Sequence, residues 1–343
     1  MRKTGIVCTL GPASDSFEKI KPMVIAGMNI ARLNMSHGTH DEHAQKIAIL
    51  RNLQQKGYDI KIMLDTKGPE VRLGTFKNGK TTLSVGQSFD LVCHEVEGDN
   101  TQVSVTYKDL FKYVQKGDLI LLNDGLVNLE VLSIENDVVH TVSHNEGVIS
   151  NRKGLCVPSR NLNIPFLSDV DKKDLLFGIE HNVDMVAASF VQDFDDLEQL
   201  RDFLDSNGGK SIKIVSKIET REALLDIDKI IELSDGVMVA RGDLGVEIPY
   251  EKLPAIQMWL ISKIKNANKF SITATEMLES MIENLRPTRA EVTDVANAVF
   301  LGSDYVMLSA ESAVGVNPPN TISVMAKIIA ESEKMLDTRT IEI

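Results

Sequence analysis

The sequence is poor in cysteine and contains no long hydrophobic run. Only 3 of its 343 residues are cysteines (Cys8, Cys93 and Cys156), an odd number without a CxxC pair. This usage excludes a disulfide framework and a zinc ribbon, and it predicts a reducing, cytoplasmic setting. The longest apolar runs, such as 185–191, fall far short of the ~20 residues that cross a bilayer. We also expect no signal peptide, because the short strand-like segment after Lys3 leads directly into GPAS.

Positive charge is also scarce. The chain has 37 Lys and Arg against 49 Asp and Glu, which gives a formal net charge of −12. Such an acidic balance argues against nucleic acid or an anionic membrane as a partner. With 43% hydrophobic and 25% charged residues, the composition is that of a soluble globular protein with a sizeable core. The length predicts two domains, or one α/β barrel that carries an insertion.

Strands and helices alternate at both ends of the chain. A capping box at Thr39 and Glu42, in which each side chain bonds the other residue's backbone N–H, predicts a helix from there to Gln55. Another helix is expected at 17–26, and a last one within 320–334. The predicted strands are 6–10, 28–33, 60–64, 185–191, 212–217, 236–240, 271–274 and 305–308.

The hydrophobic pattern changes between the third and fourth of these strands. Residues 71–163 hold short alternating runs separated by turn signals such as Asn78-Gly79 and Asp124-Gly125, which predict a small all-β domain. Removing roughly 90 inserted residues leaves about 250, the usual size of a (β/α)8 barrel. We therefore predict a TIM barrel formed by 1–70 and 164–343, with an all-β domain, 71–163, inserted after its third strand.

Charged and polar residues recur at the predicted carboxyl ends of the barrel strands. In such barrels these ends meet at one mouth, where the chemistry takes place. One charged residue at a strand end indicates only a solvated loop, but six such ends indicate a site. They are Arg32-Leu33-Asn34, Asp65, Lys217-Ile218-Glu219, Arg241-Gly242-Asp243, Thr275-Glu276 and Ser309-Ala310-Glu311.

Two other patterns are weak evidence for a functional site. Residues 74–81 match a P-loop formally, but Asn78-Gly79 favours a turn and the sequence continues as a strand, whereas a P-loop needs a following helix. His37, His40 and His43 are spaced every three residues across a helix start. We interpret them as exposed histidines of a first helical turn rather than as a metal site.

Lys217-Ile218-Glu219 is more informative. On a strand, alternation places Lys217 and Glu219 on one side and Ile218 on the other. Opposite charges that point into a barrel are costly unless they are paired or bound to a metal. With Asp243 after the next strand, two carboxylates suit Mg²⁺, which binds oxygen and takes few protein ligands. A structural ion network of these residues remains the alternative.

The motifs together resemble the pyruvate kinase family over essentially the whole length of the chain. The family's barrel, with a β-domain after the third strand, agrees with the organisation predicted above. The segments that carry the resemblance are CTLGPAS at 8–14, ARLNMSHG at 31–38, LDTKGPEVR at 64–72, RKG at 152–154, VSKIE at 215–219, MVARGDLGVEIP at 238–249, ATEMLESM at 274–281, RPTRAEVTDVANAV at 286–299 and MLSAES at 307–312.

The resemblance implies phosphoryl transfer between phosphoenolpyruvate and ADP, giving pyruvate and ATP. It implies Glu219 and Asp243 as Mg²⁺ ligands, and Lys217 as the cation that stabilises the transferring phosphoryl group and the enolate. Arg32 would contact the substrate phosphate and, with Lys217 and Thr275, act in catalysis. The implied substrate contacts are Arg32, Lys217, Gly242, Asp243 and Thr275.

The resemblance also implies a monovalent cation and a nucleotide site. Glu70, in KGPE, matches members that depend on K⁺. The implied K⁺ ligands are Asn34, Ser36, Asp65 and Thr66, and the implied nucleotide contacts are Asn34, Met35, Ser36, His37, Arg72 and Lys153.

The chain departs from the family pattern at several places. Glu42 stands where a tyrosine is common, Gln192 where an arginine is common, and Glu276 where a glutamine is usual. We expect the C-terminal effector domain to be absent, and therefore a monomer or a barrel-to-barrel homodimer rather than a tetramer. Two other functions remain open: a Mg²⁺-dependent lyase acting on an oxo acid, and a non-catalytic regulatory or binding paralogue.

Overall fold

The structure of the protein is a computed structural model that describes residues 2–158 and 160–338. The chain forms two compact units. The second unit comprises Pro69–Pro165 and Asp243–Lys252, and the first comprises the other described residues. No pattern in the sequence indicated that 243–252, in the middle of the predicted barrel, would group with the inserted segment.

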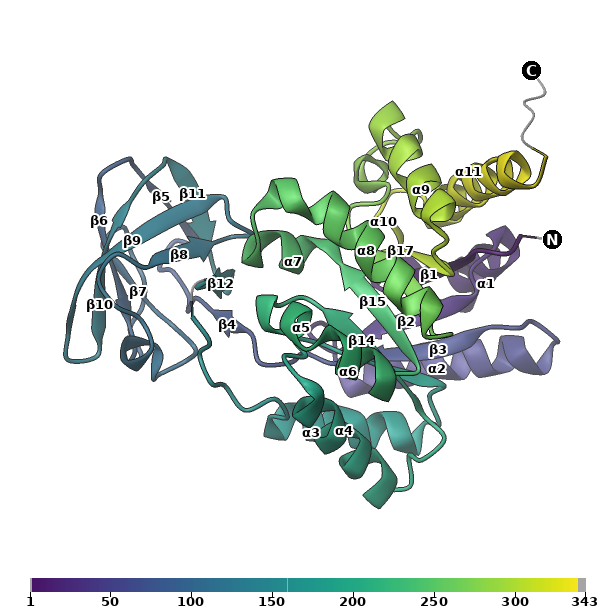
Figure 1. Cartoon of the computed structure of the whole chain (residues 1–343), viewed down its shortest axis with the longest axis horizontal. Coiled ribbons are helices and arrows are strands. Elements are labelled where there is room, and N and C mark those ends of the chain that lie inside the picture. Colours follow the sequence, from purple (N-terminus) through teal and green to yellow (C-terminus); the bar gives the residue numbers. More distant parts are fainter. Residues whose placement is uncertain (1, 159, 339–343) are drawn as a thin grey trace. The chain divides into compact units, whose positions relative to one another are not determined.

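The first unit is built around a closed barrel of parallel strands, visible with its surrounding helices in Figure 1. Around the barrel the strand order is β1-β17-β16-β15-β14-β13-β3-β2. The strands are β1 (Gly5–Thr9), β2 (Ile30–Asn34), β3 (Lys61–Asp65), β13 (Met185–Ala188), β14 (Lys213–Ile218), β15 (Gly236–Ala240), β16 (Phe270–Ala274) and β17 (Tyr305–Leu308). This arrangement confirms the predicted TIM barrel.

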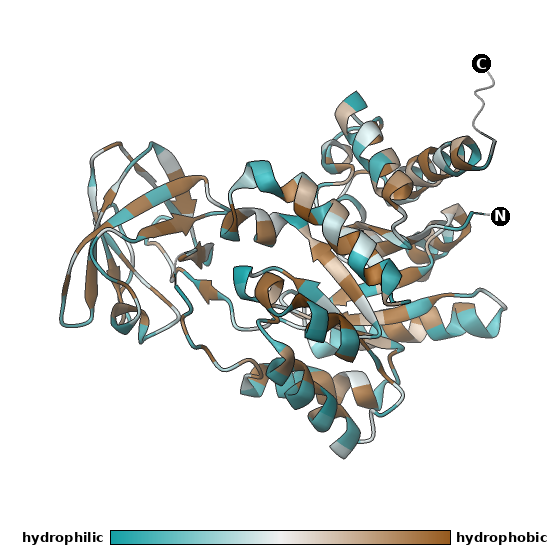
Figure 2. Cartoon of the chain, in the orientation of Figure 1, coloured by the Kyte–Doolittle hydropathy of each residue, from teal (hydrophilic) through white to brown (hydrophobic). Residues whose placement is uncertain are grey.

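Hydrophobic strands explain why the barrel closes. Most strand positions are buried and apolar, and they appear as brown ribbons in Figure 2, whereas the outer helices alternate brown and teal. Strands buried on both faces read as near-continuous apolar runs. Methionine is prominent in the cluster that fills the barrel, which comprises Val7, Ile30, Met63, Met185, Ala187, Val215, Met238, Ile272, Ala274 and Met307.

Helices follow the strands, as the alternation predicts. They are α1 (Phe17–Ala26), α2 (His40–Gln55), α3 (Asp169–Glu180), α4 (Phe194–Ser206), α5 (Arg221–Leu225), α6 (Ile227–Leu233), α7 (Arg241–Glu247), α8 (Leu253–Asn266), α9 (Arg289–Leu301), α10 (Ala310–Ala313) and α11 (Pro318–Thr338). The capping box of α2 is confirmed, because Thr39 Oγ1 accepts from Glu42 N and Glu42 Oε2 accepts from Thr39 N.

Two local predictions were wrong. The fourth barrel strand was expected to reach Val191, but β13 ends at Ala188 because the backbone of the next residues bonds to other strand ends. His43 was expected to be exposed, but its side chain is only 2% exposed. His40, Asp41 and Glu42 of the same helical turn are exposed, and helical periodicity does not show that His43 alone among them is buried.

Within Pro69–Pro165 the second unit is all-β apart from a short helical turn, and the segment Asp243–Lys252 adds most of α7 to it. A seven-stranded sheet has the order β4-β12-β8-β9-β10-β6-β7, and β5 pairs with β11 separately. The strands are β4 (Val71–Arg72), β5 (Lys80–Leu83), β6 (Ser88–Val92), β7 (Gln102–Ser104), β8 (Leu119–Leu122), β9 (Val127–Glu135), β10 (Val138–Ser143), β11 (Gly147–Ser150) and β12 (Gly154–Cys156). The apparent P-loop at 74–81 leads into β5, so it lacks the following helix that a P-loop needs, as the turn signal at Asn78-Gly79 predicted.

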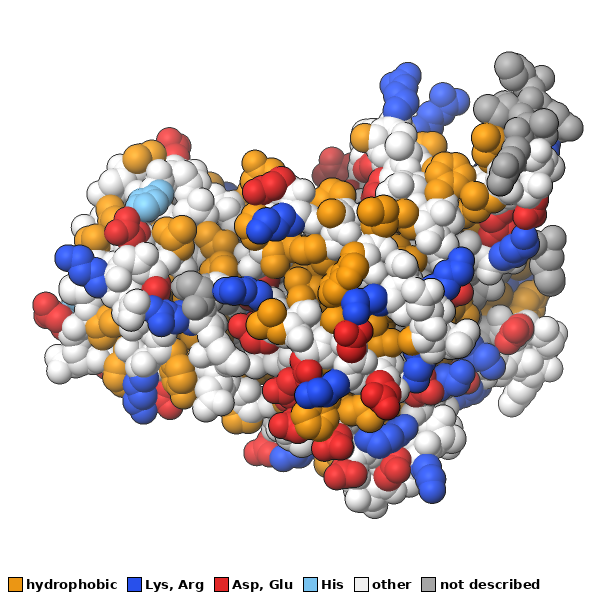
Figure 3. Space-filling view, viewed as in Figure 1, with side chains coloured by type: hydrophobic (Ala, Val, Ile, Leu, Met, Phe, Trp, Pro, Cys, Tyr) orange, Lys and Arg blue, Asp and Glu red, His pale blue; other side chains and the backbone are white. Residues whose placement is uncertain are grey.

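The surface carries charges of both signs. On the face drawn in Figure 3, acidic and basic side chains are interspersed. Among the described residues, no helix is both long and apolar enough to cross a membrane. Cys8 and Cys93 are buried, and Cys156 Sγ lies 3.0 Å from Glu247 Oε1 within the second unit.

The filling of the barrel yields a stability prediction. Met63 is fully buried in the barrel interior, so Met63→Ala should lower the free energy of unfolding by about 2–5 kcal/mol through lost contacts and a residual cavity. Met63→Leu, which nearly conserves volume, should cost less than about 1.5 kcal/mol. Urea denaturation measures both, with Met258→Ala on α8 as the control because that side chain is 55% exposed. Equal losses for Met63→Ala and Met258→Ala would contradict this view of the core.

Candidate active site at the mouth of the barrel

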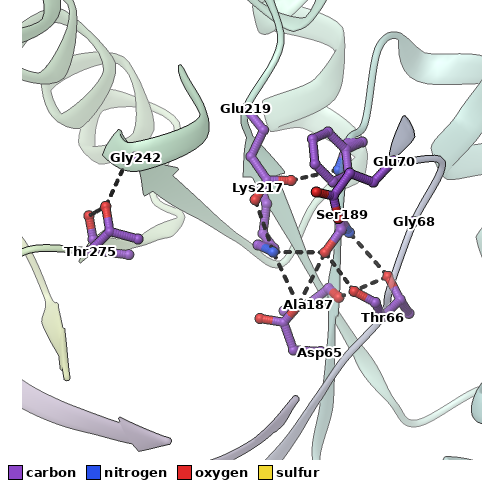
Figure 4. A network of polar contacts seen from close by, with 12 residues as sticks. Asp65, Thr66, Gly68, Glu70, Ala187, Ser189, Lys217, Glu219, Gly242 and Thr275 are labelled. Atoms are coloured by element: carbon purple, nitrogen blue, oxygen red, sulfur yellow. Dashed lines mark hydrogen bonds and ion pairs between the residues drawn. The ribbon is translucent and has the colours of Figure 1, made fainter. Parts of the chain in front are cut away.

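Four charged side chains meet near the carboxyl ends of β2, β3 and β14. Arg32 Nε donates to Asp65 Oδ2 at 2.5 Å, and Lys217 Nζ donates to Asp65 Oδ1 at 3.1 Å. Lys217 Nζ also lies 2.9 Å from Glu219 Oε1, as Figure 4 shows. Arg32 and Lys217 are each 8% exposed, and the two carboxylates 1%. Two cations and two anions therefore balance each other where water hardly reaches. We call these four residues the ion cluster.

Strand geometry explains how residues distant in sequence come together. Arg32 and Asp65 lie on the paired strands β2 and β3, in which Asn34 is aligned with Asp65. Ile218, between Lys217 and Glu219, is fully buried. The ion pair between its two neighbours agrees with the alternation predicted from the sequence. In this unit the barrel therefore unites Arg32, Asp65, Lys217 and Glu219, as the sequence predicted.

Ser189 also belongs to the site, and sequence reasoning missed it. Its Oγ accepts from Lys217 Nζ at 2.7 Å and lies 2.7 Å from the Thr66 carbonyl and 3.1 Å from Asp65 Oδ1. Its backbone N–H donates to Thr66 Oγ1 at 3.1 Å. A serine carries no charge to draw attention to it. The available signal was a small polar residue directly after a run of buried apolar ones.

The next residue, Phe190, binds the second carboxylate. Its backbone N–H donates to Glu219 Oε2 at 2.6 Å, and its φ of +56° lies in the left-handed region. Such a conformation is rare for a bulky residue and persists only where neighbouring contacts impose it. Glu219 is therefore held from two sides, by this N–H and by Lys217.

The electrostatics of Asp65 follow from its surroundings. Burial alone would raise the pKa of Asp65, but the opposing charges of Arg32 and Lys217 and their hydrogen bonds outweigh burial. The pKa is therefore held below its ordinary value, and Asp65 is a carboxylate at neutral pH.

A second group of predicted residues lies on β15, β16 and the segments that follow them. Thr275 Oγ1 accepts from Gly242 N at 2.8 Å and donates to the Ala274 carbonyl at 2.7 Å. Arg241 lies against Asp294, with Nη1 2.7 Å from Oδ2, and bonds the Ala274 and Thr275 carbonyls. Thr275 and Glu276 both have positive φ, +70° and +52°. Gly242 and Thr275 are thus brought together, as expected for one site.

The turn after β2 holds several oxygen atoms close to Asp65. Asn34 Oδ1 accepts from Ser36 N at 3.0 Å, and Met35 N donates to the Asp65 carbonyl at 3.0 Å. Thr66 directly follows Asp65 on the neighbouring strand end. The donor set formed by Asn34, Ser36, Asp65 and Thr66 contains oxygen only, which is the chemistry that hard cations require.

Other predicted residues belong to the second unit. Arg72 lies on β4 with its Nη2 2.6 Å from Glu70 Oε2, and its Nη1 donates to the Arg152 carbonyl at 2.9 Å. Lys153 directly precedes β12, which pairs with β4, and its carbonyl accepts from Leu73 N. Arg72 and Lys153 are therefore neighbours within that unit. Asp243 is grouped with the same unit.

The arrangement holds two cations in fixed positions. Arg32 and Lys217 are preorganised because Asp65, Ser189 and Glu219 hold them in place. Charges fixed in a water-poor site act more strongly on a substrate than charges in solvent. Among the described residues, we find no group of three or more His, Cys, Asp or Glu side chains that could coordinate a metal ion by themselves. Any divalent ion would therefore need water or substrate oxygens as well.

The ion cluster predicts a pH-dependent stability. Asp65→Asn leaves two buried cations without their shared anion, so the free energy of unfolding at pH 7 should fall by about 3–5 kcal/mol. Because the folded pKa of Asp65 is lowered, its contribution is complete above the unfolded value of about 4 and disappears as the pH falls through the folded value.

Chemical denaturation from pH 3 to 8 measures this difference between wild type and Asp65→Asn. The difference should be constant near neutral pH and should shrink below about pH 4. Asp15→Asn breaks an exposed ion pair with Lys19 and should have little effect, because solvent screens that pair. An Asp65→Asn variant as stable as wild type at pH 7 would contradict the assigned pairing.

Comparison with known proteins agrees with the family resemblance seen in the sequence motifs. The sequence profile of the family described as "Pyruvate kinase, barrel domain" matches residues 1–322. A pyruvate kinase of Sporosarcina psychrophila is 47% identical over 99% of this chain, and this alignment covers 59% of that relative. A pyruvate kinase of Clostridium acetobutylicum is 46% identical over 98% of this chain and 72% of its own length.

A third relative, the pyruvate kinase of Geobacillus stearothermophilus, is 46% identical over 99% of this chain and 58% of its own length. The chain thus spans between about three fifths and three quarters of the curated relatives it matches. The profile match, the identities and the barrel together show that the chain belongs to the pyruvate kinase family.

Proposed function

We propose that this chain catalyses phosphoryl transfer from phosphoenolpyruvate to ADP, giving pyruvate and ATP. The ion cluster at the barrel mouth is the observation that carries this proposal. In this reaction a β-phosphate oxygen of ADP attacks phosphorus. The bond from phosphorus to the enol oxygen breaks, and the enolate then gains a proton at carbon.

The ion cluster suits this chemistry because phosphoryl transfer depends on positioning and on stabilising spread negative charge. We assign Arg32 to the substrate phosphate and Lys217 to the transferring phosphoryl group and the enolate oxygen. Asp65 and Ser189 act through Lys217, because they fix the position of its ammonium group.

Thr275 and Gly242 complete the substrate site in this proposal. The Thr275 hydroxyl is oriented by Gly242 N and the Ala274 carbonyl. We assign it, with Lys217, to the reacting end of the substrate. Its positive φ, like that of Phe190, is the kind of strain that gathers at functional sites.

The carboxylates and other oxygen donors that match the family pattern also fit the cations of the proposal. Glu219 presents a buried carboxylate at a strand end, and we assign it with Asp243 to Mg²⁺. When bound, Mg²⁺ would neutralise charge on the phosphate oxygens. We assign K⁺ to Asn34, Ser36, Asp65 and Thr66, whose donor atoms are all oxygens, with Glu70 as the residue typical of K⁺-dependent members.

The nucleotide is assigned to two groups of residues. Asn34, Met35, Ser36 and His37 form the turn after β2, and Arg72 and Lys153 lie on the second unit. The cytoplasmic setting, and a monomer or a barrel-to-barrel homodimer, stay predictions from the sequence.

The direct test is pyruvate release from phosphoenolpyruvate, measured with ADP and Mg²⁺ in K⁺ and in tetramethylammonium buffers. We expect ADP-dependent pyruvate formation that K⁺ stimulates. Activity that is indifferent to K⁺ would leave the reaction standing and remove the monovalent site. A folded preparation that binds phosphoenolpyruvate with Mg²⁺ yet forms no pyruvate would favour a non-catalytic role.

A second test concerns Lys217. Lys217→Met should lower kcat by at least about 10²–10³-fold, because a preorganised donor to the developing charge is lost. Mg²⁺-dependent binding of phosphoenolpyruvate, followed by thermal shift, should remain detectable. Lys263→Met is the matched control, because Lys263 pairs with Asp228 on the helices outside the barrel. A near-wild-type kcat in Lys217→Met would refute the assigned role.

A further inference from the structure

A buried histidine without a role in the proposed reaction lies beside the turn after β2. His43 is in the first turn of α2 and is 2% exposed. Its Nε2 is 2.8 Å from the carbonyl oxygen of His37. A carbonyl oxygen can only accept, so Nε2 carries the proton and donates this hydrogen bond.

The other ring nitrogen of His43, Nδ1, is buried at an unfavourable free energy. His43 Nδ1 is buried, and within residues 2–158 and 160–338 it has no hydrogen-bond partner. Burial lowers the pKa of His43, so the ring is neutral at neutral pH, with Nδ1 as an unused acceptor. Burying an unpaired polar atom is unfavourable. A leucine would avoid this penalty, and the hydrogen bond that offsets it in His43 is the one made by Nε2.

The contact that Nε2 makes fixes one end of a short turn. Met35 N donates to the Asp65 carbonyl, and His37 N donates to the Asn34 carbonyl. The turn is thus attached to β3 at Met35 and to α2 at the His37 carbonyl. Between these two attachments lies Ser36, whose N–H binds Asn34 Oδ1.

Gly38, which has no side chain, allows the turn to approach α2 closely. It has a φ of +78°, and a Cβ there would lie 3.0 Å from Glu42 Oε2 and 3.4 Å from His43 Nε2. Glu42, which stands where the family commonly has tyrosine, turns its carboxylate to the Thr39 N–H of the capping box. The turn therefore packs directly against the first turn of α2.

We infer that His43 is a positioning residue that holds the Asn34–His37 turn so that the oxygens of Asn34 and Ser36 can bind a monovalent cation. The identity of that cation as K⁺ rests on the proposed function. His43 itself does not touch the cation. It acts through the His37 carbonyl, and without it this carbonyl can turn to solvent, because His37 is exposed.

A neighbouring histidine provides a matched control. His40 is the first residue of α2, three positions before His43, and its Nε2 lies 2.6 Å from Asp174 Oδ1 on α3. Asp174 is 5% exposed. His40→Leu should therefore lower the melting temperature by leaving a buried carboxylate without its partner. It leaves the contact between His43 and the His37 carbonyl in place.

The experiment follows the melting temperature of the full chain against KCl, with tetramethylammonium chloride keeping the ionic strength constant. A ligand that binds only the folded state raises the melting temperature in proportion to its occupancy. In His43→Leu we expect a melting temperature near wild type without K⁺. The K⁺ concentration for half-maximal stabilisation should rise about fivefold or more, the loss typical of one hydrogen bond. His43→Gln, which keeps an N–H donor, should recover part of the response, and His40→Leu should keep all of it.

The outcomes separate this inference from the proposed function. Equal K⁺ responses in wild type and His43→Leu, or no K⁺ response in wild type, would overturn the inference. A K⁺ response that His43→Leu weakens, in a wild-type protein that forms no pyruvate, would support the inference while the proposed reaction fails.

Discussion

The shared pairing of Asp65 with Arg32 and Lys217 is the interaction on which the barrel mouth depends. A carboxylate that is 1% exposed loses nearly all of its hydration, and only paired charges make such burial tolerable. Each cation is in turn buried because Asp65 is there. With Glu219 the four charges cancel, so the loss of any one leaves a net charge in a water-poor place. The strands that carry them, β2, β3 and β14, are therefore coupled electrostatically as well as by their hydrogen-bond ladders.

Strain at the strand ends is the second consequence of building a site there. Phe190 and Thr275 have positive φ at the ends of β13 and β16, conformations that cost of order 1–3 kcal/mol each. Each is held by a side chain or backbone group of another strand end: Glu219 accepts from Phe190 N, and Gly242 N donates to Thr275 Oγ1. The barrel core supplies the stability that permits this, and the strained residues present groups that a regular strand would direct elsewhere.

Much of this could be predicted from the sequence, since the signals are local or periodic. Alternation places Lys217 and Glu219 on one side of a strand, and the parallel barrel brings the strand ends to one mouth, so the meeting of these ends could be predicted. The pairing of Asp65 with both Arg32 and Lys217 could not, because the pattern pointed to Asp243 as the partner of Lys217 and Glu219. Ser189 and the burial of His43 could not be predicted in this way. The contact of Ser189 with Lys217 joins the ends of two separate strands, and the burial of His43 depends on how the turn before α2 folds back onto the helix, which hydrophobic periodicity does not show. The grouping of Asp243–Lys252 with the second unit depends equally on long-range contacts, such as that of Glu247 with Cys156.

The balance of charge within the ion cluster also bears on how a phosphate could enter. Arg32 and Lys217 are already paired with Asp65 and Glu219, so the four side chains offer no net positive charge. A phosphate that joined them would make the mouth strongly negative, in a chain whose net charge is already −12. Burial of an anion without compensation is unfavourable. Under the proposed function, additional positive charge must therefore arrive with the substrate. The carboxylate of Glu219 and the oxygen atoms of the turn after β2 are suited to hold cations, so under the proposed function the charge balance of the barrel itself calls for cations taken up from solution.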